Sequence, residues 1–568
     1  MESQRYSLPK GGRRWLALVI GIYVISLLVT RPDTYIDSFN YATNIVDQRM
    51  GTADPARDPF WDFGHALWRP MGYLLYICIG GPLTGMFDGN QTFAAATSLI
   101  VWSIAGALVA AVFLYLLVAR LSGSAWAAGL ATIGFVSTHA VMNFKLTGCA
   151  YSAGIGCQAA GFYYLYTALQ ERRTRLPRAL AAGVFLGLSV SIWFPFVLPL
   201  PGYLCFALLW RDETTEPRLG ARVRLLAGAS IAAAAVVAAV YLPVMAFRGI
   251  RTVEQFRQWM EASRYGIQPT RGFARMLFSI PRGFLLLKTD NGILKRVLLH
   301  DPGDRPPMAD ILSAAWKPVA VYVVLTVLAL RLRSSDWGRR MLAFLGAAAI
   351  PLLIFAAFLF DPSPPERYLG IFPLLFTSIG LVFARQPLAR ASRIVFFLFI
   401  GAMMAANSWA MWRFRPETGE AGTIARLESV NRQASKNDLI LVPSWLDDGL
   451  RFVDSQPFHR ASRFRLNLQP GVALGSVHST HWRPPVSEAI LATWQRGGRV
   501  WISRRLIQEK PAPAWWIEND ESRVRWADVS GFYRAFDTAN PVGSEDGFLE
   551  LERSPRNETL LQQATGQR

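Results

Sequence analysis

Charged side chains are scarce in this sequence of 568 residues: Asp, Glu, Lys and Arg together make up 17% of it, whereas 52% of the residues are hydrophobic. An ordinary soluble domain carries about 25% charged residues. The deficit is concentrated in long apolar runs, which excludes a chain built only of soluble domains. The length also leaves room for more than one domain.

Cysteine is nearly absent as well. The chain has four, and each lies in or beside an apolar run: Cys78, Cys149, Cys157 and Cys205. This usage excludes a disulfide framework and a zinc-binding cysteine pattern, and no Gly-rich phosphate loop or Ser-His-Asp order stands out. No residue is therefore predicted as a metal ligand, and a divalent cation stays open as a cofactor.

The apolar runs predict a polytopic α-helical membrane protein. A helix that spans a bilayer needs about 20 mostly apolar residues, because its backbone polar groups must be satisfied internally. About eleven runs approach this length: Trp15–Thr30, Phe93–Ala119, Ala125–Val141, Ala150–Leu169, Ala179–Phe194, Phe196–Trp210, Leu225–Phe247, Ala314–Leu330, Met341–Phe360, Tyr368–Ala384 and Ile394–Trp412. Lys10, Arg13 and Arg14 precede the first run and no cleavage site follows it, so we expect an uncleaved signal anchor.

Arginine clusters set the predicted orientation. The formal net charge is +19, and the basic residues between the runs form these groups: Arg13/Arg14, Arg120, Arg172/Arg173/Arg175/Arg178, Arg211/Arg218/Arg222/Arg224, Arg331/Arg333/Arg339/Arg340 and Arg385/Arg390/Arg393. With eleven spans, every group falls on one side of the membrane, as expected for cytoplasmic loops. This accounts for much of the basic excess without a nucleic-acid partner. A further span at Trp68–Phe87 would reverse the later groups, so we expect that stretch to lie along the outer face or dip into it.

The spans divide the chain into two parts. Residues 1–412 are predicted to form the transmembrane part, with a cytoplasmic N-terminus and two long outer loops at residues 31–91 and 248–313. Residues 413–568 are predicted to form a soluble α/β domain on the periplasmic side. The pattern indicates these elements in it: strands at Asp438–Pro443, Arg499–Arg504 and Gly547–Glu552, an amphipathic helix at Glu488–Gln495, and a turn at Gly497–Gly498.

The first outer loop carries the main candidates for chemistry. It begins with the segment PDTYIDSFNYATNIV, in which Asp33 and Asp37 closely follow a span. It continues to WDFGHALWRPMGYLLY, in which His65 and Arg69 precede an apolar stretch. A carboxylate at the membrane edge is unfavourable if it faces lipid, so we expect these acids to face water or a cleft.

These two segments resemble the first outer loop of the GT-C glycosyltransferases, membrane enzymes that use lipid-phosphate sugars. The resemblance is closest to the protein mannosyltransferase-like members, whose loop reads Asp-Ser-Gly-Glu and then His-Pro-Pro-Gly-Tyr. It covers most of residues 1–412. It implies a GT-C-like fold, a catalytic base at Asp37, and a cleft shaped by His65 and Arg69.

The segment STHAVMNFKLTGCAYS continues the resemblance but departs from the family pattern. Related sequences often place a further acid here, in a second outer loop. Cys149 or the adjacent Gly148 takes its place in this sequence. Lys145 and Tyr151 are therefore the polar candidates in this loop for binding substrate.

The segment DPSPPERYLGIFPLLF resembles an Arg-Tyr-x-x-x-x-Pro signature that begins a late span in many GT-C proteins. The resemblance implies that Arg367, next to Tyr368, holds a lipid phosphate. Each of these motifs is short. Their order, and their expected location on one side of the membrane, make the resemblance specific.

The activity implied is that of a glycosyltransferase in the inner membrane of a bacterial cell envelope. It would transfer a sugar, with inversion, from a polyprenyl-phosphate donor to a hydroxyl of a glycan, lipid or protein acceptor on the periplasmic side. Such a transfer needs a base for the attacking hydroxyl and cations for the departing phosphate. Asp37 suits the first role, and Arg69, Lys145 and Arg367 suit the second.

Three alternatives stay open. A lipid-linked glycan ligase or polymerase would share the donor chemistry but transfer a preassembled glycan. A non-catalytic GT-C-like scaffold would explain why the further acid is missing. A transporter fits less well, because transporters place broken helices and ion sites near the bilayer midplane, whereas these spans are nearly free of charge.

Overall fold

The structure is a computed structural model of the chain. It describes residues 8–30, 36–51, 59–86, 91–171, 174–210, 218–263, 273–287, 294, 308–359, 364–385, 390–412, 429–430, 432–442, 471–474, 482–507, 526–542 and 547–566. The chain divides into two compact units. The membrane unit comprises Met1–Thr84, Ala94–Leu286 and Lys317–Arg413, and the sheet unit comprises Gly85–Phe93, Leu287–Trp316 and Phe414–Arg568.

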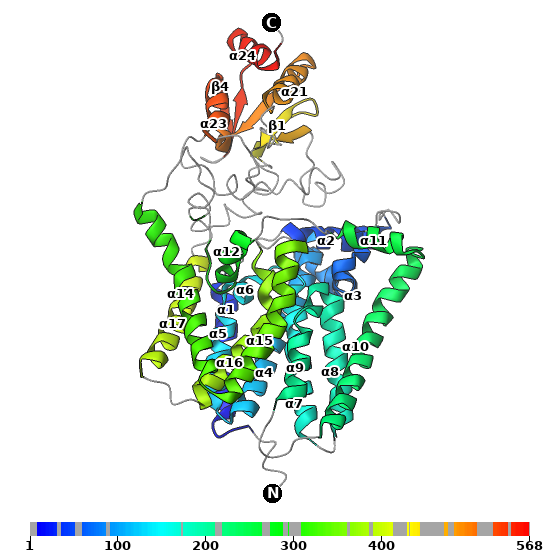
Figure 1. Cartoon of the computed structure of the whole chain (residues 1–568). Helices are drawn as coiled ribbons and strands as arrows, with labels where there is room; N and C mark the ends of the chain where they lie inside the picture. Colours follow the sequence, from blue (N-terminus) through cyan, green and yellow to red (C-terminus); the bar gives the residue numbers. More distant parts are fainter. Residues whose placement is uncertain are drawn as a thin grey trace. The chain divides into compact units, whose positions relative to one another are not determined.

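Helices make up the membrane unit (Figure 1), with short 3-10 turns marked η. The first of them are α1 (Gly12–Val29), α2 (Ile36–Met50), η2 (Pro59–Trp61), η3 (Phe63–His65), α3 (Trp68–Met86), α4 (Gln91–Ser122), α5 (Ala125–Val136), α6 (His139–Phe144), α7 (Tyr151–Gln170), α8 (Arg175–Ile192), η5 (Phe194–Val197) and α9 (Leu200–Leu209). The rest are α10 (Leu219–Phe247), α11 (Val253–Ala262), α12 (Phe273–Phe284), α14 (Met308–Arg333), α15 (Asp336–Ile354), a π-helical turn (Phe355–Leu359), η7 (Pro365–Ile371), α16 (Phe372–Arg385) and α17 (Arg390–Trp412).

The predicted spans coincide with these helices. Within the described residues, eight helical segments are long and apolar enough to cross a membrane: α1, α4, α8, α10, α14, α15 with its π-helical turn, η7 with α16, and α17. The chain is therefore a multi-pass membrane protein. The remaining predicted runs correspond to α5 with α6, to α7, and to η5 with α9. The stretch predicted to lie at the outer face forms α3, which is not among the eight.

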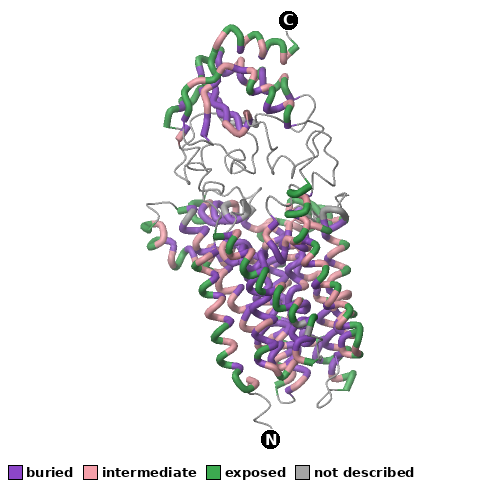
Figure 2. Tube along the Cα trace, turned by 90° about the vertical axis from the view of Figure 1, so that its left-hand side faces the viewer, coloured by how far each residue is buried: buried purple, intermediate pink, exposed green. Residues whose placement is uncertain are grey.

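α16 lies at the centre of the membrane unit. Of the span formed by η7 and α16, 83% is buried, against 22% for α1 and for α10. Figure 2 shows buried residues along the inner faces of the bundle and exposed ones on its outside. The exposed residues of the spans include large apolar side chains such as Leu28, Ile231 and Leu398. An apolar outer surface of this kind suits a lipid environment.

Small residues let neighbouring helices approach closely. Gly183 and Gly187, one turn apart on α8, face α10. A Cβ on Gly183 would lie 2.1 Å from the Ala229 carbonyl oxygen, and one on Gly187 would lie 2.7 Å from that of Ala233. A Cβ on Gly106 of α4 would likewise lie 2.3 Å from the backbone of α7. Close backbone contact of this kind is typical of helix packing in membranes.

One predicted span, Ala125–Val141, is interrupted, so the expectation of a single continuous helix is wrong there. α5 ends at Val136, and Thr138 starts the short helix α6. The Thr138 side chain accepts a hydrogen bond from the backbone of the first turn of α6, at 3.4 Å. Ser and Thr favour helix starts for this reason, so the break has a local cause inside an apolar run.

Asn407 of α17 satisfies backbone groups that such breaks leave open. Its side-chain amide donates to the carbonyls of Ser137 at 2.9 Å and Phe284 at 2.7 Å. Its carbonyl oxygen accepts from the backbone N–H of Leu286 at 3.0 Å. Irregular backbone is tolerated at membrane depth only when the protein supplies such partners.

Basic groups from separate loops meet at one end of the bundle. Arg120 of α4 and Arg178 of α8 both pair with Glu171, which follows α7. Arg222, in the first turn of α10, donates to the carbonyls at the end of α9. Arg385 donates to a carbonyl in the last turn of α4. The arginines thus stabilise the carbonyl ends of helices, where positive charge is favourable.

The sheet unit contains a five-stranded sheet of order β2-β1-β3-β5-β4. Its strands are β1 (Leu439–Val442), β2 (Gly471–Leu474), β3 (Val500–Ser503), β4 (Thr538–Val542) and β5 (Phe548–Leu551), and its helices include α21 (Arg483–Gln495), α23 (Trp526–Arg534) and α24 (Pro555–Thr565). β1 pairs in parallel with β2 and β3, and β5 pairs antiparallel with β3 and β4. The predicted α/β character, its three strands and its helix are confirmed, whereas β2, β4, α23 and α24 were not predicted.

Replacing Gly183 by Ala is expected to destabilise the membrane unit, because the added Cβ would push against the backbone of α10. Overpacking of this kind costs about 1–3 kcal/mol, measured as a lower melting temperature of the purified protein in detergent. Gly401→Ala on α17 is the matched control, since a Cβ there meets nothing within 4 Å. Equal melting temperatures for the two variants would contradict the importance of this close approach.

Candidate active site

The expected catalytic base, Asp37, lies in the first turn of α2. α2 begins at Ile36, and the structure describes the backbone of Asp37 but not its side chain. The next residue, Ser38, is buried; its hydroxyl donates to the Thr147 carbonyl and lies 3.4 Å from the sulfur of Cys149. The start of α2 therefore rests against the connection between α6 and α7.

Four side chains from the first outer loop and α2 form what we call the Asp62 cluster: Tyr41, Asp62, His65 and Arg69. His65 Nδ1 donates to Asp62 Oδ2 at 2.8 Å, and Arg69 Nη1 lies 3.4 Å from the same oxygen. The Arg69 guanidinium lies over the Tyr41 ring, 4.5 Å from its centroid. The Tyr41 hydroxyl is 3.3 Å from His65 Nε2. The side chains of Asp62 and His65 are 16% and 12% exposed, so the cluster is shielded without being sealed.

Asp62 is ionised. Burial opposes its charge, but the hydrogen bond from His65, the charge of Arg69 and a hydrogen bond from Ser263 together hold the pKa of the Asp62 carboxyl well below its usual value. Ser263 directly follows α11, and its hydroxyl donates to Asp62 Oδ1. The carboxylate therefore ties the first outer loop to the end of α11.

Side chains from α10 and α11, and from the turn between them, hold the backbone on both sides of this carboxylate. The Trp61 carbonyl accepts hydrogen bonds from the Trp259 indole at 2.8 Å and from the Arg248 guanidinium at 3.1 Å. The Phe63 carbonyl accepts one from the Tyr241 hydroxyl at 2.8 Å. The loop is thus positioned by the fold itself, as precise site geometry requires.

A series of ring contacts leads from the Asp62 cluster to the second predicted arginine. The His65 ring lies 6.5 Å from the Tyr151 ring, which packs edge-on against Trp193 at 4.8 Å. The Arg367 guanidinium lies 5.7 Å from the centroid of the Trp193 ring. Arg69 and Arg367, far apart in the sequence, therefore stand at the two ends of one continuous set of contacts.

Tyr368, the neighbour of Arg367, lies in the apolar core. It is buried in an apolar cluster with Met276 of α12 and Leu352 of α15. Its neighbour Glu366 is also buried and lies 3.8 Å from the Arg367 guanidinium. The structure thus separates the predicted pair: Arg367 borders the ring series, and Tyr368 is part of the core.

Lys145, in the connection between α6 and α7, is fully buried. Its ammonium donates to the Ser26 hydroxyl on α1 and lies 5.2 Å from the centroid of the Tyr23 ring. Burial lowers the pKa of Lys145 to about 7. These contacts connect Lys145 to α1 rather than to the Asp62 cluster.

The segment without the further acid anchors two helices instead. Gly148 has a φ of +69°, a left-handed conformation that favours glycine. Its carbonyl accepts a hydrogen bond from the Trp68 indole of α3 at 3.1 Å, and the Cys149 carbonyl accepts one from Ser103 of α4 at 2.9 Å. Asp62 of the first loop is connected to this segment through His65, whose ring lies 6.5 Å from that of Tyr151.

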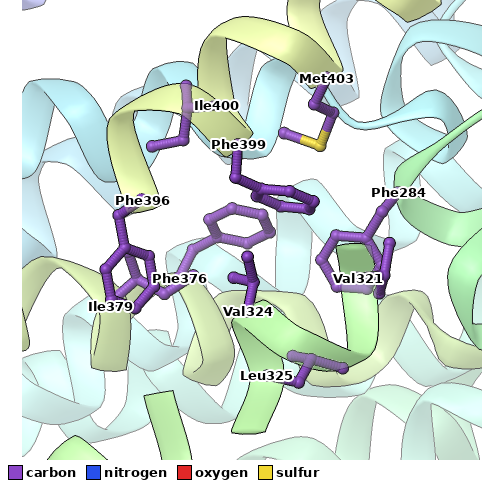
Figure 3. A pocket seen from close by; sticks show the side chains of 10 residues that line it. All are labelled: Phe284, Val321, Val324, Leu325, Phe376, Ile379, Phe396, Phe399, Ile400 and Met403. Carbon is purple, nitrogen blue, oxygen red and sulfur yellow. The ribbon is translucent and has the colours of Figure 1, made fainter. Parts of the chain in front are cut away.

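Two further observations bear on what the membrane unit can hold. Among the described residues, no group of three or more His, Cys, Asp or Glu side chains could hold a metal ion. A cavity lies between α12, α14, α16 and α17 (Figure 3), and all ten residues that line it are apolar, among them Phe284, Phe376 and Met403. This cavity suits hydrocarbon rather than polar chemistry.

Several residues of the site were not predicted from the sequence. Asp62 stands three residues before His65, a spacing that would have indicated a carboxylate–histidine pair. Tyr41, Trp193 and Ser263 have no such signal, because each meets its partners through contacts distant in the sequence. Only the folded chain shows that they belong to the site.

No protein-family model and no curated protein matches this sequence. The fold, however, is GT-C-like, as the first-loop and late-span segments predicted. ArnT from Cupriavidus metallidurans, in the apo state, aligns with a TM-score of 0.50 at 10% sequence identity, over 96% of this chain and 98% of ArnT. At this identity the likeness shows the fold, and the roles of individual residues depend on the site geometry.

Two other crystal structures are also similar. ArnT from Cupriavidus metallidurans bound to undecaprenyl phosphate aligns with a TM-score of 0.49 at 11% identity, over 96% of this chain and 98% of that one. The Archaeoglobus fulgidus oligosaccharyltransferase in complex with Zn and sulfate aligns with a TM-score of 0.49 at 13% identity, over 93% and 73%. Neither of these two similarities adds to what the apo ArnT structure shows about the fold.

Replacing Lys145 by Met should remove a pH dependence of stability. With a pKa of about 7 when folded, against an ordinary value of 10.5, Lys145 binds fewer protons in the folded state between these values. The stability of the wild type should therefore rise with pH across this range, by about 2 kcal/mol from pH 7 to pH 9, and level off below pH 7 where both states are protonated. Melting temperatures of both proteins, measured between pH 6 and pH 9, test this pH dependence. Parallel curves of melting temperature against pH for the two proteins would contradict the role assigned to Lys145.

Proposed function

We propose that this protein transfers a sugar from a polyprenyl-phosphate donor to a hydroxyl of an acceptor at the outer side of a bacterial inner membrane. The observation that carries the proposal is the continuous set of contacts that joins Arg69 to Arg367, next to the start of α2. Two cations at the ends of a shielded, aromatic path suit a donor with a phosphate and a lipid tail. The GT-C fold supports this donor class.

In the proposed reaction, the acceptor oxygen attacks the anomeric carbon while the bond from that carbon to the phosphate oxygen breaks. Asp37 takes the proton of the attacking hydroxyl. Arg69 and Arg367 bind the phosphate and stabilise its developing charge. His65 and Tyr151 line the cleft between them. Attack opposite the departing phosphate inverts the sugar.

The proposed orientation follows from the arginine-rich end of the bundle. We place this end in the cytoplasm because basic loops are retained there. α10 carries Arg222 in its first turn at that end, and Arg248, just after its last turn, contacts Trp61 in the first outer loop. A helix of 29 residues is about 43 Å long, enough to cross a bilayer. The Asp62 cluster is therefore assigned to the periplasmic side, where a lipid donor and a water-borne acceptor can meet.

A divalent cation is not part of the proposed steps. Asp62, the carboxylate described in the site, is already engaged by His65, Arg69 and Ser263. The described residues therefore supply no ligand set for a metal ion. The proposed steps use a carboxylate and arginines of the chain itself.

Asp37→Asn should lower the rate of sugar transfer by roughly 100- to 10,000-fold, the usual contribution of a general base. The measurement is transfer of radiolabelled sugar from polyprenyl-phosphate donors in membranes with matched expression of each protein. Asp33→Asn, in the same loop, is the matched control and should transfer sugar like the wild type. Equal rates for the wild type and the Asp37→Asn protein would remove Asp37 from the mechanism.

The same assay separates the alternatives. Transfer from a lipid-linked preassembled glycan, but from no monosaccharide donor, would indicate a ligase or polymerase. No transfer from either donor class would favour a non-catalytic scaffold. Movement of the lipid-linked sugar across proteoliposomes without transfer would indicate a transporter.

Arg69→Gln and Arg367→Gln should each lower kcat/KM for the lipid donor by roughly 10- to 150-fold, because a hydrogen bond to a charged group contributes about 1.5–3 kcal/mol. Arg257→Gln on α11 is the matched control, since Arg257 is half exposed and pairs with Glu254 on the surface; it should stay close to the wild type. Equal losses in all three proteins would point to a general effect of charge rather than to phosphate binding.

A further inference from the structure

Asp62 takes no step in the proposed transfer of the sugar. It is ionised, largely buried and engaged on both oxygens, with His65 and Arg69 at Oδ2 and Ser263 at Oδ1. Its backbone neighbours are held by side chains of α10 and α11 and of the turn between them. A carboxylate so fully occupied acts through its neighbours rather than on a substrate.

The contact with His65 decides which ring nitrogen carries the proton. An ionised carboxylate can only accept hydrogen bonds, so His65 Nδ1, 2.8 Å from Asp62 Oδ2, is the protonated nitrogen. Nε2 is then the nitrogen that can gain and lose a proton, and it faces the Tyr41 hydroxyl at 3.3 Å.

Several charged or titratable groups surround His65 and its loop. They are Asp62 and Arg69 from the first loop, Tyr41 from α2, Tyr151 from α7, Tyr241 from α10 and Arg248 after α10. Arg69 balances the charge of Asp62, so protonation of His65 gives the cluster a net positive charge. That charge matches a phosphate group.

We propose that Asp62 is a positioning residue: it accepts the hydrogen bond from His65 Nδ1 and so orients the ring for Nε2 to deliver a proton to the phosphate of the departing lipid. This inference rests on the proposed function. When the donor binds, a phosphate oxygen replaces the Tyr41 hydroxyl as the partner of Nε2. The departing phosphate monoester, whose second ionisation lies near pH 6, gains a negative charge as the bond to the sugar breaks, so it can take this proton.

The step balances in atoms and electrons. The bond from the acceptor oxygen to the anomeric carbon forms, and the bond from that carbon to the phosphate oxygen breaks. The electron pair of the broken bond stays on the phosphate oxygen, and the phosphate takes the proton of His65 Nε2. Asp37 takes the proton of the acceptor hydroxyl. Exchange with water then returns both residues to their starting states.

The first test does not depend on turnover. Nitrogen NMR of the full chain in nanodiscs, labelled at its six histidines, reports which ring nitrogen is protonated, and the His65→Gln spectrum assigns the His65 signals. At pH 8 we expect the proton on Nδ1 in the wild type and a mixture of both forms in the Asp62→Asn protein. A His65 ring protonated on Nε2 alone in the wild type would overturn the proposal.

The second test uses the sugar-transfer assay. Asp62→Asn should lower kcat by roughly 100-fold or more with a much smaller change in KM. The double variant Asp62→Asn/His65→Gln should be no slower than His65→Gln alone, since Asp62 acts through His65.

Ser263→Ala separates positioning of His65 from anchoring of the loop. It removes the hydrogen bond from the end of α11 but leaves the contact between Asp62 and His65, so it should lower the melting temperature and leave the proton of His65 on Nδ1. Losses for Asp62→Asn that simply add to those for His65→Gln, with His65 still protonated on Nδ1 in the Asp62→Asn protein, would show that Asp62 only anchors the loop. If the wild type transfers no sugar, the proposed function fails and the proton delivery with it, while the NMR result still decides whether Asp62 sets the form of His65.

Discussion

The membrane unit depends on one constraint: a backbone polar group inside a bilayer must find its partner within the protein. Long helices such as α4 and α10 meet it by themselves. Where α5 and α12 end, Asn407 of α17 satisfies two carbonyls and one N–H, and Arg222 does the same at the end of α9. These hydrogen bonds determine where the helices can end. They therefore also determine where loops, and the polar side chains they carry, can lie.

Hydrogen bonds from side chains to backbone carbonyls also position the candidate site. Side chains from α10 and α11 and the turn between them hold the carbonyls of Trp61 and Phe63, and the Trp68 indole holds that of Gly148. The Asp62 cluster thus rests on backbone that is already fixed, so its charges are arranged before a substrate binds. A likeness to ArnT at 10% identity shows that this fold tolerates extensive change in sequence. Function therefore depends on the site rather than on the fold.

Much of the fold was predictable because length and apolarity are local properties. The eight long apolar helices fall on predicted runs, and the strands β1, β3 and β5 fall on predicted strands. The break at Ser137 and Thr138 was not predicted, since the apolar run continues through it and its partner Asn407 is 270 residues away. β4 carries the sequence TANPV at a sheet edge. A proline and mostly exposed residues remove the alternation that marks a strand.

The sequence by itself determined a multi-pass membrane protein with a C-terminal α/β part, because hydrophobicity acts residue by residue along the chain. It also singled out His65, Arg69 and Arg367 through short motifs that resemble one family. Tertiary structure alone decided which of these residues meet: it joined His65 and Arg69 to Asp62, led from them to Arg367 through Tyr151 and Trp193, and placed Lys145 against α1 and Tyr368 in the core. The reason is that charge pairs and hydrogen bonds act over a few ångströms in space, and the chain separations they bridge leave no mark in the local pattern.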